Sequence, residues 1–292
     1  MRVELTAFKE LPEFPSGSGI EFYDDKIYLV GDDAHDVLVM NRKWKPQDLI
    51  TLFDSPEERI LESQKANPKT STLFFISKKP HLLIPGSGSN ELSNNGILFN
   101  LLNKEIHMFD GSVFYERVKN AGIEELNIEG VTLVHDYLIL SNRGSGNNPV
   151  NHLIITSVDF YKKQQDVAFQ LVKLEPEQNA ANVFVSGITY SDKHEILLLA
   201  ISAKDSSAST NEEIGESSSL GLIENFYRKI GREKGRMKIN EMIDLTGEDE
   251  KFKGHKIESL CIQSEKDHSM KIHLTAGGKD GATYLFKAQL KL

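Results

Sequence analysis

The sequence contains a single cysteine, Cys261, among 292 residues. An intrachain disulfide is therefore excluded, and so is a zinc site built from several thiolates. Cys261 lies in an apolar run, and free cysteine is among the most buried residue types. We therefore expect Cys261 to be a small residue of the hydrophobic core.

Long apolar segments are also missing. No run of 18 apolar residues occurs, so the sequence predicts no transmembrane helix. The first ten residues, MRVELTAFKE, lack the apolar stretch of a signal peptide. These two absences lead us to expect a cytoplasmic protein that does not bind a membrane.

An excess of positive charge is absent as well. The 34 Lys and Arg residues are outnumbered by 43 Asp and Glu residues, which gives a formal net charge of −9. Binding of nucleic acid needs a concentrated basic face, so nucleic acid is not expected as a partner. An anionic membrane surface is disfavoured for the same reason.

Two families of hydrolytic motif are not found. The sequence has no Gly-x-Ser-x-Gly stretch, so a serine hydrolase is not supported, and no His-Glu-x-x-His pair for zinc. Aromatic residues make up 8% of the chain, and the one tryptophan, Trp44, lies in a predicted turn. A propeller of Trp-Asp repeats or an aromatic-rich sugar-binding propeller is therefore disfavoured.

What the sequence does contain is a repeat. SGIEFY (18–23), NIEGVTL (127–133), SGITYS (186–191) and KIESLCI (256–262) resemble one another. An alignment on Glu21, Thr72, Glu129, Thr189 and Glu258 divides the chain into five units spaced by 51 to 69 residues. Each unit reads as short apolar strands that end at Gly, Asn, Asp or Lys.

This repeat predicts an all-β fold, a five-bladed β-propeller with four-stranded antiparallel blades in a single domain, residues 1–292. The blades are expected to start near residues 18, 70, 127, 186 and 256. The last unit has only three strands, so VELTAFKEL (3–11) is expected to complete it and close the ring. Six blades, one of them degenerate, are the alternative.

Two segments interrupt the repeat. Residues 55–68, SPEERILESQKANP, are predicted to hold one or two helical turns before Pro68. Residues 203–219 are rich in Ser and acidic residues and almost free of apolar ones, which predicts a flexible insertion. This insertion is either a solvated loop or a lid over a binding site.

In a propeller, the entrance to the first strand and the exit from the second strand meet at one mouth of the central channel. We therefore expect Glu21, Glu129 and Glu258 to share this mouth and to be the catalytic candidates. Three carboxylates at one place repel one another and need a cation. Residues that carry oxygen ligands for Ca²⁺ or Mg²⁺ are Glu21, Asp32, Asp33, Glu129, Glu258 and Asp280.

Positive side chains at the same mouth are the alternative to a metal. Residues expected to bind a small, anionic molecule are Lys69, Thr72, Asn142, Arg143, Lys256 and Lys279. Each of these positions also has a structural interpretation, because Gly-Asp and Gly-Ser at the end of a strand are ordinary hairpin chemistry.

The motifs SGIEF, NIEGV and KIESL, followed by strands that end in GDD, NRG and GGKDG, resemble the esterase-like phytase group and related calcium-dependent propellers. The sequence is more similar to an uncharacterised bacterial propeller family with the opening SGIE…YLVGDD. The resemblance implies that Glu21, Glu129 and Glu258 face the channel, that Asp32 and Asp33 lie at its rim, and that calcium is bound. Thr72 and Thr189 depart from this acidic pattern.

Three functions fit these observations. The first is hydrolysis of a phosphoester, ester or lactone, in which a metal activates water and a glutamate is the general base. The second is a glycosidase with paired carboxylates on the channel. The third is a non-catalytic module that binds a small molecule or a protein partner on the same face, since propellers host all of these functions.

Overall fold

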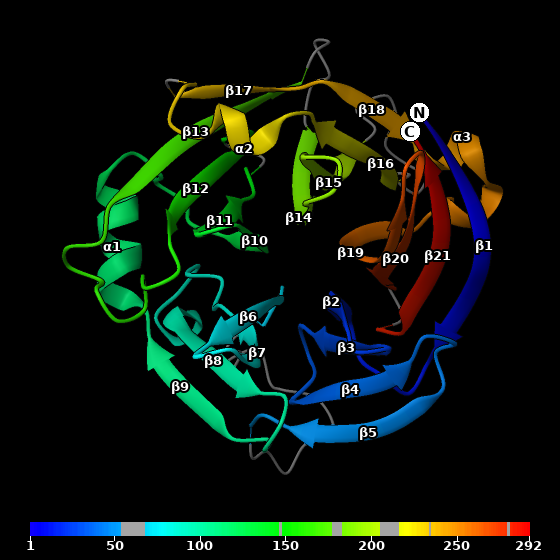
Figure 1. Cartoon of the computed structure of the whole chain (residues 1–292), viewed down its shortest axis with the longest axis horizontal. Coiled ribbons are helices and arrows are strands. Elements are labelled where there is room, and N and C mark those ends of the chain that lie inside the picture. The colour runs from blue at the N-terminus through cyan, green and yellow to red at the C-terminus, as the bar shows by residue number, and fades with distance from the viewer. Residues whose placement is uncertain (54–67, 146–147, 177–182, 205–215, 234, 279–280) are drawn as a thin grey trace, which may run out of the picture.

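The computed structural model describes residues 1–53, 68–145, 148–176, 183–204, 216–233, 235–278 and 281–292. Five β-sheets stand around a central axis, each with its first strand innermost (Figure 1). The predicted five-bladed β-propeller is therefore confirmed. No helix among the described residues is long and apolar enough to span a lipid bilayer.

The first two blades follow the predicted four-strand pattern. Blade one contains β2 (Gly17–Tyr23), β3 (Lys26–Gly31), β4 (Asp36–Asn41) and β5 (Pro46–Thr51). Blade two contains β6 (Thr72–Ile76), β7 (Lys79–Ile84), β8 (Asn95–Asn100) and β9 (Ile106–Asp110). In both blades a two-residue turn with positive φ joins the first two strands, Asp24-Asp25 and Ser77-Lys78, as tight hairpins of twisted strands require.

The chain crosses from the fourth blade back to the third before it completes the fourth. Blade three contains β10 (Ile128–Val134), β11 (Tyr137–Asn142), β12 (His152–Ser157), β13 (Phe169–Pro176) and β17 (Arg236–Ile239). Blade four contains β14 (Val183–Ser191), β15 (Ile196–Lys204), β16 (Glu216–Ile223) and β18 (Glu241–Asp244). β17 pairs in parallel with β13, so blade three has five strands and is not purely antiparallel.

The segment KINEMIDL (238–245) reads in the sequence as one apolar strand of blade four, but the structure divides it between two blades. Asn240 divides the segment: its amide N–H donates to the carbonyl of Leu222, and its side-chain oxygen accepts from the amide of Glu224 and from Lys229 Nζ. The residues before Asn240 therefore join blade three, where Met237 and Ile239 are buried, and those after it join blade four.

The N-terminal strand closes the ring, as predicted. Blade five contains β19 (Lys256–Lys266), β20 (Ser269–Gly277), β21 (Thr283–Lys291) and, as its outermost strand, β1 (Arg2–Leu11). β1 pairs antiparallel with β21 from Arg2↔Lys291 to Leu11↔Thr283. Figure 1 shows the two chain ends side by side on this blade.

In the ranges that the structure describes, helices are few and short, and each lies between strands. They are α1 (Ser112–Asn120), α2 (Phe226–Lys229), α3 (Leu245–Glu248) and the 3-10 turns η2 (Leu92–Asn94) and η3 (Glu250–Phe252). The strand pattern did not predict α1, which links blade two to blade three and buries Phe114, Tyr115 and Val118 between them.

The hydrophobic core lies between the blades. Tyr28 and Val30 of blade one, for example, belong to one buried cluster with Leu82 and Phe99 of blade two. Cys261 belongs to the cluster between blades five and one, which confirms it as a buried core residue. Face-to-face packing of this kind fixes the positions of the inner strands around the channel.

The structure describes only part of the two segments that interrupt the repeat. Residues 54–67, where helical turns were predicted, lie outside the described residues. Residues 205–215 of the predicted insertion also lie outside them, while its two ends belong to β15 and β16.

Ring closure can be tested at Val3, which is 2% exposed and packs into the core between blades four and five. Val3→Ala should lower the free energy of unfolding by about 2 kcal/mol, because two buried carbons are lost and a small cavity remains. Urea denaturation measures the change, and Arg2→Ala on the exposed side of β1 is the matched control. Equal stability of the two variants would contradict a stabilising role for β1.

Candidate functional site

The innermost strands of four blades share a β-bulge near their start. The register shifts between Gly17 and Gly19, Ile128 and Gly130, Val185 and Gly187, and Ile257 and Ser259. A bulge leaves one residue out of the pairing and redirects its side chain. The residues at the bulges are Ser18, Glu129, Ser186 and Glu258.

A glycine follows three of these bulges because inner strands of neighbouring blades approach closely there. A Cβ atom on Gly187 would lie 2.7 Å from the carbonyl oxygen of Glu258, which is closer than packed atoms allow. The bulge of blade four is thus held against blade five, and this contact limits the width of the channel.

The positions of the bulges show that Glu21 and Glu129 should not be aligned in the sequence repeat. Glu21 pairs with Tyr28 and lies three residues after the bulge at Ser18. Thr132 and Thr189 occupy the equivalent places after their bulges, in pairs with Ile139 and Leu198. Glu21 is therefore not equivalent to Glu129 and Glu258, and the expectation that the three glutamates share one mouth was wrong.

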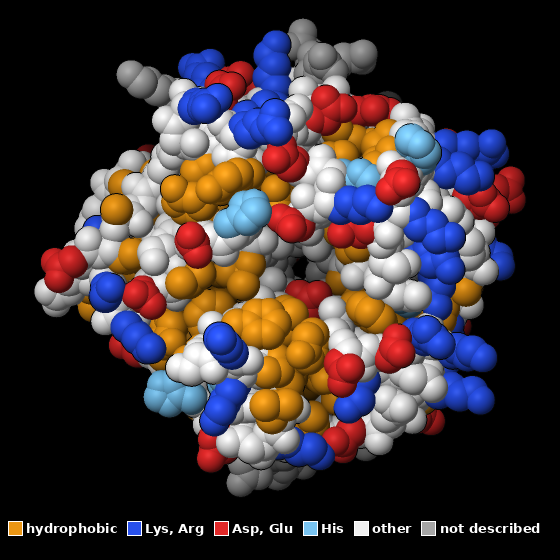
Figure 2. Space-filling model, viewed as in Figure 1, with side chains coloured by type: hydrophobic (Ala, Val, Ile, Leu, Met, Phe, Trp, Pro, Cys, Tyr) orange, Lys and Arg blue, Asp and Glu red, His pale blue; other side chains and the backbone are white. Residues whose placement is uncertain are grey.

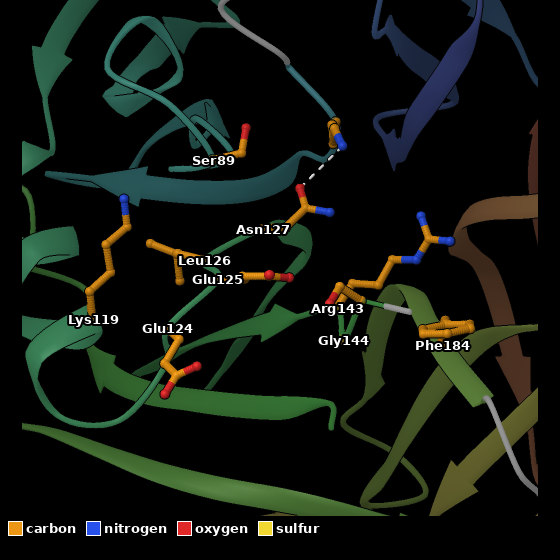
Figure 3. A pocket seen from close by; sticks show the side chains of 11 residues that line it. Ser89, Lys119, Glu124, Glu125, Leu126, Asn127, Arg143, Gly144 and Phe184 are labelled. Atoms are coloured by element: carbon orange, nitrogen blue, oxygen red, sulfur yellow. Dashed lines mark hydrogen bonds between the residues drawn. The ribbon is translucent and has the colours of Figure 1, made fainter. Parts of the chain in front are cut away.

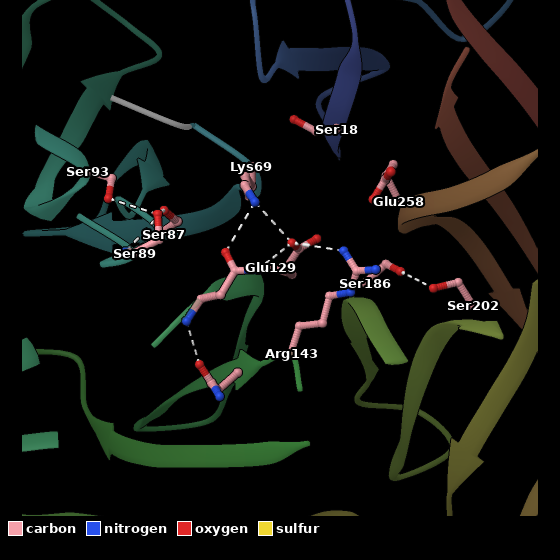
Figure 4. Close-up of polar contacts among 12 residues, drawn as sticks. Ser18, Lys69, Ser87, Ser89, Ser93, Glu129, Arg143, Ser186, Ser202 and Glu258 are labelled. Atoms are coloured by element: carbon pink, nitrogen blue, oxygen red, sulfur yellow. Dashed lines mark hydrogen bonds and ion pairs between the residues drawn. The ribbon is translucent and has the colours of Figure 1, made fainter. Parts of the chain in front are cut away.

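Glu129 and Glu258 do meet at the predicted mouth, in a cavity of about 320 Å³ that we call the Glu129–Glu258 cavity. Its walls come from the starts of inner strands and the ends of second strands in blades one, two, three and five (Figure 4). The lining residues are Ser16, Ser18, Asp32, Lys69, Glu129, Arg143, Lys256, Glu258, Gly277 and Gly278.

Glu129 is the most strongly paired carboxylate of this cavity, and its side chain is almost fully buried. Its Oε1 accepts from Lys69 Nζ at 3.0 Å and from Asn127 Nδ2 at 2.8 Å, and Arg143 lies 3.4 Å away. Burial by itself raises the pKa of Glu129, but Lys69, Lys256 and Arg143 outweigh burial and hold the pKa below its ordinary value. Glu129 is therefore an ionised carboxylate at neutral pH.

The surroundings of Glu258 shift its pKa in the opposite direction to that of Glu129. Lys256 Nζ contacts both of its carboxylate oxygens, at 2.6 and 2.8 Å. Burial raises the pKa of Glu258, Lys256 offsets this only in part, and the nearby charge of Glu129 raises the pKa further. One cavity thus contains two carboxyl groups whose pKa values are shifted in opposite directions.

Arg143 connects this cavity to a second one. Its guanidinium carbon lies 5.3 Å from the centre of the Phe184 ring, and its buried Nε has no hydrogen-bond partner in the described part of the chain. The adjoining cavity, of about 480 Å³, lies between blades two, three and four (Figure 3). It is lined by Lys69, Ser89, Lys119, Glu124, Glu125, Leu126, Asn127, Arg143, Gly144, Ser145 and Phe184.

The other predicted site residues are distributed as follows. Asn142 is buried, and its side chain bonds the backbone of Asn127 and Glu125, so it supports the loop before β10. Asp33 accepts a hydrogen bond from the Ser16 hydroxyl at 2.8 Å. Thr72 and Glu21 line a cavity at the opposite mouth of the channel. Lys279 and Asp280 lie outside the described residues.

Of the predicted metal ligands, Asp32, Glu129 and Glu258 line one cavity, while Asp280 lies outside the described residues. Among the described residues, no three or more Asp, Glu, His and Cys side chains are grouped so that they could hold a metal ion. Glu21 lies at the other mouth, and Glu129 and Glu258 already contact cationic side chains. Calcium binding stays a prediction, and no chemical step below depends on it.

Sequence reasoning missed Phe184 and Lys119, which line the cavity next to Arg143. Their positions relative to the repeat do not recur from blade to blade, so no pattern indicates them. The glycine that follows three of the four bulges was a usable signal. An alignment on Gly19, Gly130 and Gly187 brings Glu129 into register with Ser18 and Ser186.

Solved structures with the same fold are distant in sequence. Glutaminyl cyclase from Myxococcus xanthus has a TM-score of 0.50 and 10% identity, over 99% of this chain and 96% of that chain. Virginiamycin B lyase from Staphylococcus aureus has a TM-score of 0.46 and 10% identity, over 99% and 100%. A luciferin-regenerating enzyme has a TM-score of 0.46 and 7% identity, over 97% and 94%. At such identities the similarity extends to the fold alone.

The sequence matches a protein-family model but no curated protein. A family model described as "Family of unknown function (DUF6929)" matches residues 13–290. No curated protein has a significant sequence match. The resemblance to the phytase group that the motifs indicate stays a prediction.

A pH-dependent stability is expected from Glu21. Burial raises its pKa from 4.5 to about 7. As pH rises from about 4.5 to 7, the unfolded chain therefore loses this proton before the folded protein does, and the wild type loses stability. Glu21→Gln removes this loss, so its melting temperature should exceed that of the wild type at pH 8, with the gain shrinking toward pH 4.5.

Thermal melts between pH 4.5 and 8 measure this difference. Glu13→Gln is the control, because Glu13 is exposed and its replacement should leave a difference that does not vary with pH. A gain from Glu21→Gln that is the same at both ends of the range would contradict the raised pKa.

Proposed function

Because the chain belongs to this family of unknown function, we propose its activity from the site: it binds a small anionic molecule in the Glu129–Glu258 cavity and hydrolyses it. The observation that carries this proposal is that a buried carboxyl group, Glu129, a half-buried one, Glu258, and three cationic side chains line one cavity. Buried, concave and polar sites on rigid strands are where proteins hold small molecules.

The cations provide recognition of an anion. Lys69 Nζ contacts Asn127 and Glu129, and Lys256 Nζ contacts the two oxygens of Glu258, so each ammonium group keeps one N–H to donate. Arg143 Nε has no partner among the described residues, and its planar guanidinium suits the two oxygens of a carboxylate or phosphate. We therefore propose a carboxylate or phosphate group on the substrate.

The two glutamates provide acid and base. Ionised Glu129 removes a proton from water as the water oxygen attacks the carbonyl carbon or phosphorus. Glu258, whose pKa is raised, gives its proton to the leaving oxygen as the ester bond breaks. One proton is taken up and one is released, and solvent exchange then restores both groups. The reaction class is hydrolysis of an ester, lactone or phosphoester.

Glycoside hydrolysis fits this cavity less well. The described residues that line the Glu129–Glu258 cavity include no aromatic side chain on which a sugar ring would stack. A non-catalytic binding module is the second candidate, and a specific observation favours it. Each carboxylate is already ion-paired, Glu129 with Lys69 and Arg143 and Glu258 with Lys256.

Anion binding is the first test. Citrate and phosphate should raise the melting temperature in a saturable way, equivalent to about 2.7 kcal/mol at 100 times the Kd. Arg143→Gln should weaken this binding about tenfold or more, because one charge-assisted contact is lost. Lys104→Gln, on the exposed surface, is the control. Stabilisation that is absent in the wild type, or equal in Arg143→Gln, would refute the anion site.

Catalysis is tested by hydrolysis of nitrophenyl esters, nitrophenyl phosphates and lactones that carry a carboxylate. Glu129→Gln and Glu258→Gln should each lower the rate by about 10²- to 10⁴-fold. Glu21→Gln is the control, since Glu21 lies at the other mouth. Saturable anion binding without hydrolysis of any of these substrates would favour the non-catalytic module.

The calcium prediction is tested separately. A melt in EDTA followed by millimolar Ca²⁺ or Mg²⁺ should leave the melting temperature unchanged, because Lys69, Arg143 and Lys256 already compensate the glutamates. A rise in melting temperature that Glu129→Gln abolishes would instead establish a metal in this cavity.

A further inference from the structure

The opposite mouth of the channel has a cavity of its own, of about 370 Å³, which we call the Glu21 cavity. It is lined by Glu21, Thr72, Leu73, Phe75, Thr132, Leu133, Thr189, Tyr190, Asp192, Ile262, Gln263, Ser264 and Glu265. We propose that this cavity binds a small hydroxylated amine in its protonated form, with Glu21 as the counter-ion. This proposal does not depend on the proposed hydrolysis.

The charge of the Glu21 cavity is the reverse of that at the first mouth. Glu21, Asp192 and Glu265 line it, and no Lys, Arg or His is among its described lining residues. Asp192 lies beside His135, and Glu265 accepts a hydrogen bond from the Ser191 hydroxyl, so both have partners at the rim. Figure 2 views the ring from this side, with hydrophobic side chains around the open channel and most Lys and Arg toward the periphery.

Among the described residues, no cationic side chain pairs with Glu21, although its carboxylate is held firmly. The amide of Phe22 donates to one oxygen at 2.9 Å, and the amide of Leu73 in blade two donates to the other at 3.0 Å. Burial raises the pKa to about 7, and these hydrogen bonds and one from Thr72 offset burial only in part. A carboxylate that packing partly removes from water is stabilised by a positive partner, and an ammonium group in the cavity would provide it.

The titratable groups around Glu21 do not replace that partner. Cys261, on β19, has a thiol pKa raised by burial and by Glu21 itself, so it stays neutral. Tyr28, which pairs with Glu21 across β2 and β3, has its pKa raised to about 12. His273, on β20, has its pKa lowered to about 3 by burial and by Lys287, so its ring is neutral as well.

An independent observation concerns a polar group in the cavity wall. The buried hydroxyl of Tyr190 has no hydrogen-bond partner in the described part of the chain. Buried polar groups are normally satisfied, so this hydroxyl indicates a ligand with a polar group beside its amine. Thr132, which is 5% exposed, adds a second hydroxyl to the same wall.

A hydrogen-bond chain orients Gln263 toward the same ligand. Trp44 Nε1 donates to His273 Nδ1 at 3.0 Å, which leaves the proton of the neutral ring on Nε2. That Nε2 donates to Gln263 Oε1 at 2.9 Å. The carbonyl of Gln263 is thus occupied, and its NH₂ group remains to donate to a ligand hydroxyl. An ammonium for Glu21 and a hydroxyl for Gln263 together define the ligand as an amino alcohol.

The test is an NMR titration of the full-length protein at constant ionic strength, because NMR detects millimolar affinity. The probe is ethanolamine, and ethylene glycol is the matched probe without the charge. Ethanolamine should cause saturable shifts centred on Thr132, Thr189 and Gln263. Ethylene glycol should bind at least tenfold more weakly.

The pH dependence adds a readout specific to Glu21. Ethanolamine stays protonated between pH 6 and 8, while the ionised fraction of a group with a pKa of about 7 rises about tenfold over this range. The affinity should therefore rise about tenfold from pH 6 to pH 8 in the wild type.

Two variants test whether Glu21 is the counter-ion of the bound amine. Glu21→Gln should lose the binding and its pH dependence, and Glu258→Gln at the other mouth should keep both. Equal binding of ethylene glycol, no saturable shifts with ethanolamine, or unchanged binding in Glu21→Gln would each overturn the proposal. None of these outcomes bears on hydrolysis at the Glu129–Glu258 cavity, which a Glu258→Gln rate measurement tests by itself.

Discussion

The antiparallel pairing of β1 with β21 is the constraint on which the remaining structure depends. It joins the two ends of the chain in one blade and so closes the row of sheets into a ring. Because the ring is closed, the first strands of all blades surround one channel. Both cavities of interest exist only as the two mouths of that channel.

The carboxyl groups at the two mouths of the channel have different charged surroundings. At one mouth, Glu129 and Glu258 lie among Lys69, Arg143 and Lys256, and this arrangement separates their pKa values. At the other mouth, Glu21 is held by backbone amides with no cationic partner in the described part of the chain, and burial dominates its pKa. The same residue type therefore has a different chemical character according to the charges that other blades bring to it.

The sequence indicated much of the fold but less of the site. Strand composition and the repeat predicted five blades, and the three-strand last unit predicted that residues 3–11 would close the ring. Lys69, Arg143, Lys256, Glu129 and Glu258 were predicted at one mouth, and they line one cavity there. Glu21 was misplaced, because the alignment followed the Ile-Glu pair and not the glycine that follows a bulge.

The sequence by itself determined the repeat, the strands and the closure, because these follow from local alternation of apolar residues and from strand count. Only the tertiary structure decided which glutamates meet, because a bulge shifts a side chain by one position and leaves no regular sequence pattern. The same holds for the pKa values, the Trp44–His273–Gln263 chain and the fifth strand of blade three. Each depends on residues from different blades or distant segments that packing alone brings together.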